Sequence, residues 1–204
     1  MYKKPVIVFE GIEGSGKSFH VNNVSKFLKK KKIDHIKLRE PGGNINSEKI
    51  RKLILNNKSN FNENTDLLLY LAARSENIYQ LKKFYKKKII LIDRFTDSTL
   101  AYQHYGLGVN LSFIMKINQY LLKNFKVDFT FLNTVDHKNM IDRLSKRKKL
   151  NRYDNFKKDF YKKVQKGFLK IAHKEVKKYQ IINSNLDIEK NKKIVINKIE
   201  NLIK

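Results

Sequence analysis

Eight consecutive residues near the N-terminus have the types and spacing of a phosphate-binding loop. Residues 11–18 match the pattern G-x-x-x-x-G-K-[ST]. Glycines let backbone N–H groups point inward around a phosphate chain, which a Cβ atom would obstruct. Lys17 can reach the β- and γ-phosphates of ATP, and the Ser18 hydroxyl is placed to ligate Mg²⁺. The predicted nucleotide-binding residues are Gly11, Ile12, Glu13, Gly14, Ser15, Gly16, Lys17 and Ser18.

The flanks of this loop decide between two interpretations of it. A glycine-rich turn could simply join a strand to a helix. Here an apolar run at residues 6–9 precedes the loop, and apolar residues recur at helical spacing from Val21 to Leu28. The order strand, loop, helix favours phosphate binding, because a helix that begins near Lys17 turns its positive dipole end toward the same anion.

Further candidates for phosphoryl chemistry are one acid and a set of arginines. Asp93 ends an apolar strand, where phosphate-loop enzymes place a Mg²⁺-binding acid; the alternatives are a helix cap or an ion pair. Transfer between ATP and an anionic acceptor requires cations on both sides of the moving group. Arginine matches phosphate geometry better than lysine does, although each arginine could equally be a surface cation. The candidates are Arg74, Arg94, Arg143, Arg147 and Arg152.

Tyr70 and Arg74 are spaced i, i+4 and should project from one helical face. An aromatic ring beside a guanidinium suits stacking on a base, although a tyrosine at this spacing is more often a core residue. The five histidines show no metal-ligand spacing and receive no role.

Five predicted strands alternate with helices along the chain and position these residues. This order predicts a parallel sheet with helices on both faces, whose ligands bind beyond the carboxyl ends of the strands. Arg39, Glu40, Asp93, Arg94 and Asn133 all fall at that edge. The predicted strands cover residues 6–10, 35–38, 89–93, 129–132 and 180–183. Helices are predicted over 17–31, from a Ser47 cap, over 62–84, 97–102 with an Asp97–Ser98 cap, 111–125, 140–149 and 156–176, and at the C-terminus.

Composition limits the class of protein. The 204 residues suit one domain, and the chain has no cysteine for disulfides or thiolate zinc sites. No apolar run approaches the ~20 residues that cross a bilayer, and residues 1–5 lead directly into a strand, so we expect a cytoplasmic protein without a signal peptide. The net charge of +26 suggests a nucleic-acid partner, but the lysines are scattered, and compositional drift explains them as well.

Taken together, these motifs resemble the bacterial thymidylate kinases, a family of phosphate-loop nucleoside monophosphate kinases. Besides the phosphate loop, the matching segments are residues 39–43, 48–51, 70–74, 93–95, 97–103 and 151–152. Many enzymes share the loop, whereas the ordered set at these intervals is specific. The resemblance covers nearly the whole chain and implies a single kinase domain, residues 1–204, with a short lid within about 143–155.

The resemblance implies transfer of the γ-phosphoryl group of ATP to dTMP, with Mg²⁺, for dTTP biosynthesis. Arg51 and Arg94 would hold the acceptor phosphate, and Glu13 would face the acceptor sugar. Tyr102 would fill the space of a ribose 2′-hydroxyl. The implied substrate-binding residues, several of them around thymine, are Glu40, Arg51, Tyr70, Arg74, Arg94, Ser98, Thr99, Tyr102 and Gln103. The implied catalytic residues are Glu13, Lys17, Arg94, Arg147 and Arg152, and Ser18 and Asp93 would hold the metal.

Some details depart from the family pattern. Tyr70 stands where phenylalanine is common, and Phe19 stands where a second hydroxyl residue often follows the loop. A lysine-crowded lid, residues 146–149, leaves open which cation acts on the transferred group. Alternative functions are a kinase for another nucleoside monophosphate or a nucleic-acid-binding ATPase. The resemblance implies dTMP as the substrate and a homodimer. We expect no membrane partner, and no nucleic-acid partner because no recognised basic-aromatic binding module is present.

Overall fold

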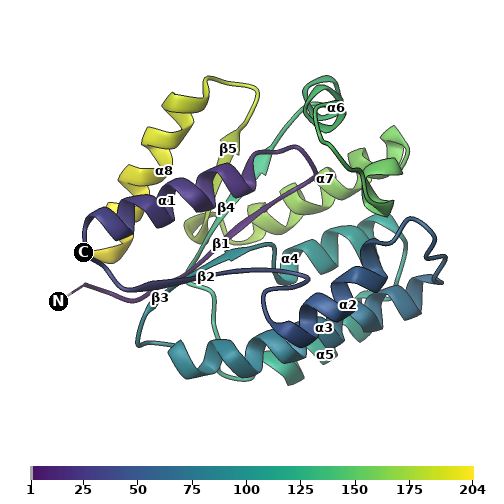
Figure 1. Ribbon diagram of the computed structural model, residues 1–204, viewed down its shortest axis with the longest axis horizontal. Coiled ribbons are helices and arrows are strands. Elements are labelled where there is room, and N and C mark those ends of the chain that lie inside the picture. The colour runs from purple at the N-terminus through teal and green to yellow at the C-terminus, as the bar shows by residue number, and fades with distance from the viewer. Residues whose placement is uncertain (1) are drawn as a thin grey trace.

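The computed structural model describes residues 2–204 and contains one sheet of five parallel strands in the order β2-β3-β1-β4-β5 (Figure 1). The strands are β1 (Val6–Gly11), β2 (His35–Arg39), β3 (Ile89–Asp93), β4 (Phe129–Thr134) and β5 (Tyr179–Asn183). Every predicted strand is present, and the predicted five-stranded parallel sheet is confirmed.

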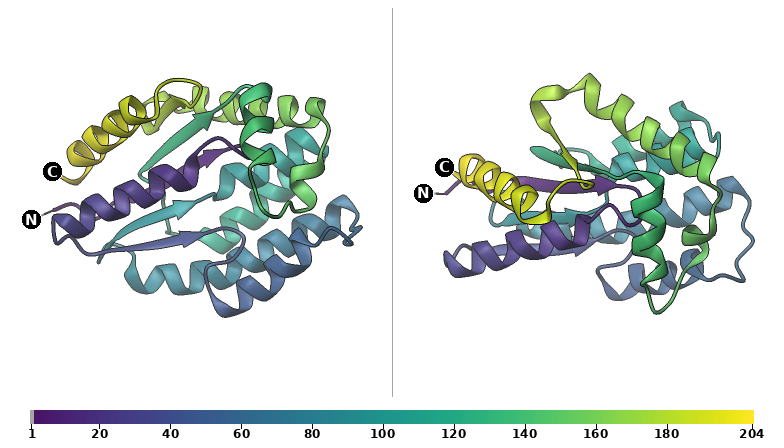
Figure 2. Two further views of the ribbon diagram at one scale, coloured as in Figure 1. Left: turned by 45° about the horizontal axis from the view of Figure 1, so that its top comes forward. Right: turned by 90° about the horizontal axis from the view of Figure 1, so that it is seen from above.

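Helices connect the strands and lie on both faces of the sheet (Figures 1 and 2). They are α1 (Lys17–Lys30), α2 (Ile45–Leu55), α3 (Glu63–Phe84), α4 (Thr96–Thr99), the π-helical η1 (Leu100–Gly106), α5 (Leu111–Leu122), α6 (His137–Ser145), the 3₁₀-helical η2 (Arg152–Asn155), α7 (Lys158–Lys174), the 3₁₀-helical η3 (Val176–Lys178) and α8 (Ile188–Ile203).

Alternation along β1 explains why both faces of the sheet are covered. Ile7 and Phe9 pack against α1 and α8, whereas Val6 and Val8 face α3 and α5. Successive strand residues point to opposite faces, so an uninterrupted apolar run requires helices on both sides. All six residues of β1 are buried. The sheet therefore fixes the loop that follows β1 rigidly at its edge.

Strand register brings the carboxyl ends together. Phe9 lies opposite Asp93 in β3, Gly11 lies opposite Asn133 in β4, and Arg39 of β2 lies opposite Asp93 on its other side. The predicted convergence of these strand ends at one edge is confirmed, and it is the position where parallel sheets bind ligands.

The predicted Ser47 cap is wrong. Helix α2 begins at Ile45, and the Asn44 side chain caps it by accepting a hydrogen bond from the Ser47 backbone N–H at 2.9 Å. The Ser47 hydroxyl instead accepts the N–H of Gly42 at 2.9 Å. Both side chains can act as caps. Asn44 is the cap here because the turn before α2 places the Gly42 N–H against the Ser47 hydroxyl.

The predicted Asp97–Ser98 cap is also wrong. Helix α4 starts at Thr96 without a side-chain cap, and the chain continues as a π-helix to Gly106, four residues beyond the predicted end at Tyr102. Buried Glu10 of β1 accepts the backbone N–H groups of Phe95 and Ser98 and so replaces a local cap. π-Helical turns are frequent at functional sites.

Several predicted helix ends shift by a few residues. The helix predicted at 140–149 spans His137–Ser145, because Asp136 caps its N-terminus by accepting from Asn139 N–H at 2.7 Å. Helix α5 ends at Leu122 rather than 125, and α7 covers Lys158–Lys174 rather than 156–176. Such ends depend on caps more than on periodicity.

The two ends of the described chain lie side by side (Figure 2). The Lys3 backbone N–H donates to the Ile203 carbonyl at 2.9 Å, which ties the start of the chain to the end of α8. Within residues 2–204, no helix combines the length and the apolar character needed to span a membrane.

Helix α7 packs closely on η1, and Gly167 marks the contact. A Cβ at Gly167 would lie 2.6–2.8 Å from the ring and Cβ of Tyr105. Since these atoms lie close to the Tyr105 backbone, they cannot move away freely. We expect Gly167→Ala to destabilise the protein by about 1–3 kcal/mol, as overpacking does. Chemical denaturation measures the loss; Lys166→Ala, at the exposed neighbouring position, is the control and should change stability little. Equal stability of the two variants would contradict the contact.

Candidate active site

The loop between β1 and α1 has the backbone conformation of a phosphate loop. Gly11, Gly14 and Gly16 have positive φ angles of 139°, 66° and 87°. At Gly11 a Cβ would lie 2.2 Å from the Asn133 carbonyl oxygen, so only glycine allows β1 and β4 to approach here. Helix α1 begins at Lys17, as predicted, and its N–H groups open toward the loop.

Lys17 lies inside this loop. Its ammonium group donates to the carbonyls of Gly11 and Ile12 at 2.9 and 2.8 Å, and the residue is 6% exposed. Burial, followed by the positive charge of Arg94, lowers the pKa of Lys17 to about 7. A phosphate chain bound against it would favour its charged form.

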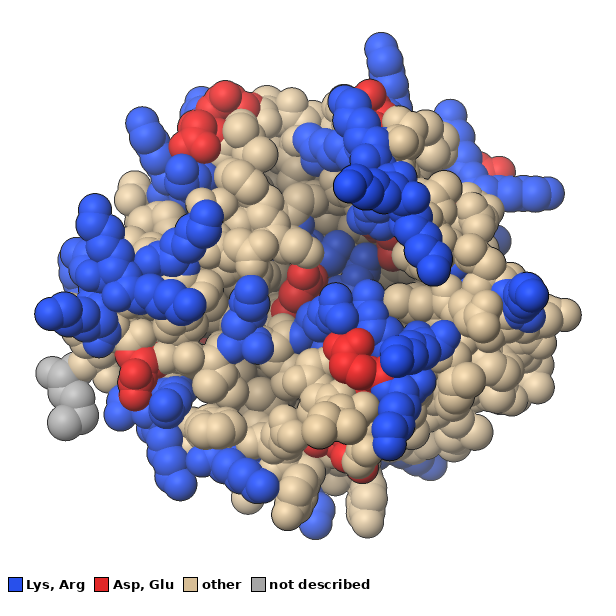
Figure 3. All heavy atoms as spheres, in the orientation of Figure 1, with Lys and Arg blue, Asp and Glu red and all other residues tan. Residues whose placement is uncertain are grey.

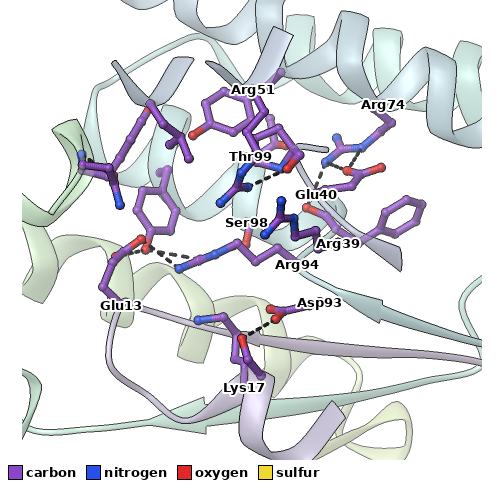
Figure 4. Close-up of a pocket in the computed structure, with 18 of the residues that line it drawn as sticks. Glu13, Lys17, Arg39, Glu40, Arg51, Arg74, Asp93, Arg94, Ser98 and Thr99 are labelled. Atoms are coloured by element: carbon purple, nitrogen blue, oxygen red, sulfur yellow. Dashed lines mark hydrogen bonds and ion pairs between the residues drawn. The ribbon is translucent and has the colours of Figure 1, made fainter. Parts of the chain in front are cut away.

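Ser18 and Asp93 form a pair of oxygen ligands beside Lys17. The Ser18 hydroxyl donates to a carboxylate oxygen of Asp93 at 2.6 Å, across the end of β3 (Figure 4). Oxygen donors of this kind suit Mg²⁺, which commonly takes one or two protein ligands and completes its shell with water and phosphate. Residues 2–204 contain no cluster of three or more His, Cys, Asp or Glu that could hold a metal by themselves.

A cavity of about 200 Å³ opens beside this pair. It brings together predicted site residues from α1, α2, α3, β3, α4 and η1 and from the loops that follow β1, β2, β3 and α6. Those that line it are Glu13, Lys17, Ser18, Glu40, Arg51, Tyr70, Arg74, Asp93, Arg94, Ser98, Thr99, Tyr102, Gln103 and Arg147. Arg152 is absent from the lining, whereas its neighbours Asn151 and Tyr153 contribute to it.

Arg94 joins the phosphate loop to this cavity (Figure 4). Its guanidinium donates to the Gly11 carbonyl at 2.9 Å and to a Glu13 oxygen at 2.8 Å, and it lies within 3.3 Å of Ser98 Oγ and the Tyr102 hydroxyl. The backbone of Arg94 has φ 69°, an uncommon left-handed conformation for a residue with a side chain. These bonds hold that conformation in place.

The Glu13 carboxylate has a second hydrogen-bond donor besides Arg94. The Tyr102 hydroxyl donates to the other Glu13 oxygen in a short bond, and the Arg94 guanidinium lies 5.2 Å from the centre of the Tyr102 ring. Burial raises the pKa of Tyr102 well above its usual value, so the phenol remains a proton donor. The three side chains form one fixed wall of the cavity.

Glu40 and Arg74 form a buried ion pair at the far end of the cavity (Figure 4). Arg74 also donates to Asn118 at 2.8 Å and to the Phe95 carbonyl at 2.9 Å, and it is 2% exposed. Burial raises the pKa of the Glu40 carboxyl, although the Arg74 charge opposes this. The predicted placement of Tyr70 and Arg74 on one face is confirmed, since both line the cavity.

Three arginines concentrate positive charge at the cavity. Arg51 donates to the Pro41 carbonyl at 2.6 Å, and burial together with nearby Arg39 lowers the pKa of Arg51. Arg39 forms an ion pair with Glu48 at 3.0 Å and also lines the cavity. With Arg94, these guanidinium groups suit an anionic ligand such as a phosphate monoester.

The two predicted lid arginines differ in placement. Arg147 lines the cavity and pairs with buried Asp154 at 2.8 Å. Arg152 does not line the cavity: it bonds the buried Asp66 of α3 and lies over the Phe61 ring. Arg143 donates to the carbonyls of Gly14 and Ser184, next to the phosphate loop.

Sequence reasoning missed two buried carboxylates. Glu10 bonds Ser98 Oγ at 2.5 Å in addition to the backbone of 95 and 98, and so shapes the turn after Arg94. Asp66 accepts from Gln103, Arg152 and Tyr153. The sequence contained a pattern that could have identified each of them. Glu10, like Asp93, is an acid in an apolar strand. Asp66, Tyr70 and Arg74 are spaced i, i+4 and i+8, so they share one helical face.

Lysines cover the molecular surface around this site. In Figure 3 the blue side chains of Lys and Arg stand in scattered groups separated by broad tan areas, and a hollow near the centre holds both blue and red groups. These scattered cations do not form a continuous surface for nucleic acid. The net charge of +26 increases solubility and attracts anions in general.

The fold and the cavity place the chain among the phosphate-loop kinases that act on small anionic acceptors. The family model described as thymidylate kinase matches residues 9–195. The chain is 36% identical to a thymidylate kinase of Clostridium novyi (strain NT) over 93% of its length and 95% of that protein. It is 35% identical to one of Acholeplasma laidlawii (strain PG-8A), over 95% and 97% of the two chains.

A solved structure agrees with these relatives. The crystal structure of thymidylate kinase from Ehrlichia chaffeensis matches with a TM-score of 0.78 and 30% identity, over 97% of this chain and 98% of that one. The chain belongs to the thymidylate kinase family.

The environment of Glu10 predicts a pH-dependent stability. Burial, followed by the nearby Asp97 charge, raises the pKa of Glu10 from 4.5 to about 7. Between these values the folded protein keeps a proton that the unfolded chain has released, so the free energy of unfolding decreases as pH rises and levels off above about 7. We expect Glu10→Gln to show a smaller decrease, because glutamine does not titrate.

Calorimetric unfolding at about pH 5 to about pH 8 measures this difference. The control is Glu189→Gln on the exposed surface of α8, which should follow the unmodified protein. If Glu10→Gln and the unmodified protein lose stability in parallel, Glu10 does not titrate in this range.

Proposed function

We propose that this protein is a thymidylate kinase that transfers the γ-phosphoryl group of ATP to dTMP and yields dTDP and ADP. The observation that carries the proposal is one cavity that joins the phosphate-loop lysine and the Ser18–Asp93 pair to an arginine cluster and an aromatic pocket. Family membership supports the acceptor. As a source of dTDP for dTTP synthesis, the protein would work in the cytoplasm, where ATP is the abundant phosphoryl donor.

On the donor side, the proposal assigns ATP to the phosphate loop. Backbone N–H groups of residues 11–16 and the start of α1 would hold the phosphates, and Lys17 would move from its carbonyl partners onto the β- and γ-oxygens. Ser18 and Asp93 would bind Mg²⁺, which neutralises charge on the phosphates. Catalysis then consists of positioning and charge neutralisation, without a general base.

On the acceptor side, Arg51 and Arg94 would hold the 5′-phosphate of dTMP. Both guanidinium groups line the cavity next to Lys17, so the acceptor oxygen would face the γ-phosphate. Glu13, fixed by Arg94 and Tyr102, would bind the 3′-hydroxyl of the sugar. The Tyr102 ring would occupy the space of a 2′-hydroxyl and so favour deoxynucleotides.

The base would lie between Tyr70, Arg74 and Gln103. Tyr70 offers a ring for stacking, and the ion pair with Glu40 fixes the position of the Arg74 guanidinium. The Oε1 atom of Gln103 is buried and has no hydrogen-bond partner within residues 2–204, so it is available to a ligand. Ser98 and Thr99 would complete the pocket.

Residues 143–155 would act as a lid over ATP. Arg147 already lines the cavity and would supply the cation nearest the transferred group. Arg152 would contribute by holding η2 to α3 through Asp66, which differs from a direct catalytic role. Closure would exclude water from the reacting phosphates.

A panel of acceptors tests this function. We expect the highest kcat/KM with dTMP among dTMP, dCMP, dAMP and dGMP in a coupled assay of ADP release. Chelation of Mg²⁺ should stop turnover, and added Mg²⁺ should restore it. Lys17→Ala should lower kcat by about 10²-fold or more, because one charge contact to the transition state is lost. Stabilisation of this variant by dTMP should persist, since the acceptor cavity is retained.

Two outcomes would contradict the proposal. Equal turnover with several acceptors would point to a general nucleoside monophosphate kinase. ATP hydrolysis that oligonucleotides stimulate, with an affinity that falls steeply with salt, would point to a nucleic-acid-binding ATPase, the alternative that the net charge of +26 suggests.

We also propose a homodimer formed through α3 and α5. Along α3 an exposed stripe of apolar and small side chains contains Leu68, Ala72, Ser75 and Tyr79. Residues 63–81 contain no lysine, and their one arginine, Arg74, is buried, although the chain has 45 lysines and arginines. Two copies of so basic a chain could associate here without charge repulsion. On α5 the exposed side chains include Phe113, Met115 and Tyr120.

Light scattering after size-exclusion chromatography tests this association. We expect the mass of two chains for the unmodified protein and of one chain for Ala72→Lys, because the substitution places two like charges at the centre of the stripe. Val176→Lys, at an exposed apolar position in η3, is the matched control and should remain dimeric. A monomeric unmodified protein would refute the proposal.

A further inference from the structure

Asp66 is a buried carboxylate whose contact with Gln103 has been given no role so far. It lies in the first turn of α3 and is 3% exposed. One of its oxygens accepts a short bond from Arg152, and the other accepts from the Tyr153 hydroxyl and from Gln103 Nε2 at 3.3 Å. The carboxylate therefore connects α3 to η1 and η2, 37 to 87 residues away in sequence.

The chemistry of Asp66 fixes the orientation of the Gln103 amide. An ionised carboxylate only accepts hydrogen bonds, so the amide group must turn its NH₂ toward Asp66. The Tyr153 hydroxyl gives its proton to Asp66 and therefore also acts as an acceptor for Gln103 Nε2, at 3.4 Å. Both neighbours require the same orientation. A reversed amide would place its oxygen against two acceptors.

This orientation determines what the cavity offers to a base. Gln103 lines the cavity with Thr99 and Tyr70, and its Nε2 atom lies 3.3 and 3.4 Å from the Asp66 and Tyr153 oxygens. Its Oε1 atom is buried and has no partner within the described chain. An unpaired buried acceptor costs free energy unless a ligand supplies a donor. The cavity at this point is thus complementary to an N–H group and disfavours a bare ring nitrogen.

We infer that Asp66 is a positioning residue for base specificity: it holds Gln103 with Oε1 toward the ligand and so selects a base with a ring N–H over one with an unprotonated ring nitrogen. Thymine has such an N–H, whereas cytosine presents a lone pair at the same ring position. The inference rests on the proposed dTMP acceptor site. Asp66 does not contact the reacting atoms and acts through Gln103.

Asp66→Asn tests the inference with an isosteric side chain. Its amide both donates and accepts, so Gln103 can reverse and present NH₂ to the ligand. We expect the ratio of kcat/KM for dTMP over dCMP to fall about tenfold, the effect of one hydrogen bond between neutral groups, and mainly through KM. Dissociation constants of dTMP and dCMP without ATP should change in the same sense. Asp66→Ser, whose hydroxyl also donates and accepts, carries the same expectation.

Two control variants separate this role from packing. Asp66→Glu keeps an acceptor-only carboxylate and should retain the preference for dTMP. Asp154→Asn loosens the same segment, since Asp154 pairs with Arg147 and Asn151, but Asp154 makes no hydrogen bond to Gln103. It should lower turnover with both acceptors in proportion and leave their ratio unchanged.

The outcomes distinguish this inference from the proposed function. An unchanged dTMP to dCMP ratio in Asp66→Asn and Asp66→Ser overturns the inference alone. A ratio that falls equally in Asp154→Asn also overturns it, because the effect would then come from packing of 151–155. An unmodified protein without preference for dTMP overturns both the acceptor assignment and the inference.

Discussion

The arrangement of the site depends on the hydrogen bonds of one group, the guanidinium of Arg94. It bonds the Gly11 carbonyl and Glu13 at the phosphate loop, and it lies within 3.3 Å of Ser98 Oγ and the Tyr102 hydroxyl in the same wall of the cavity. A left-handed residue directly after β3 makes this reach possible. Because β1 and β3 are neighbours in one parallel sheet, a single side chain can join the phosphate loop to the cavity.

Buried carboxylates balance the positive charge of the site. Glu13 pairs with Arg94, Glu40 with Arg74 and Asp66 with Arg152, each pair joining segments distant in sequence. A buried charge without a partner is costly, so removal of one member would leave the other unsatisfied. These pairs also orient the polar groups that face the cavity. Arg51 and Arg39 also line the cavity, and Arg39 has the more exposed Glu48 as its partner.

Different elements hold the phosphate loop and the rest of the cavity. The sheet and α1 hold the phosphate loop, and their register is fixed by the apolar core. The π-helix η1 carries Tyr102 and Gln103. Glu10 holds α4, which leads directly into η1, and α7 packs against η1. The phosphate loop thus depends on backbone geometry, whereas the wall of the cavity formed by α3, α4 and η1 depends on side-chain networks between helices.

The sequence by itself determined the strands, the phosphate loop and the acid that ends β3, because each depends on residues that are adjacent or periodic along the chain. It did not reveal that Asn44 rather than Ser47 caps α2, that Glu10 replaces a cap at α4, or that Arg152 turns to Asp66. Only the tertiary structure decided these, because each choice depends on which groups approach one another from distant segments. The orientation of the Gln103 amide has the same origin: two acceptors that the fold brings beside it leave its oxygen free.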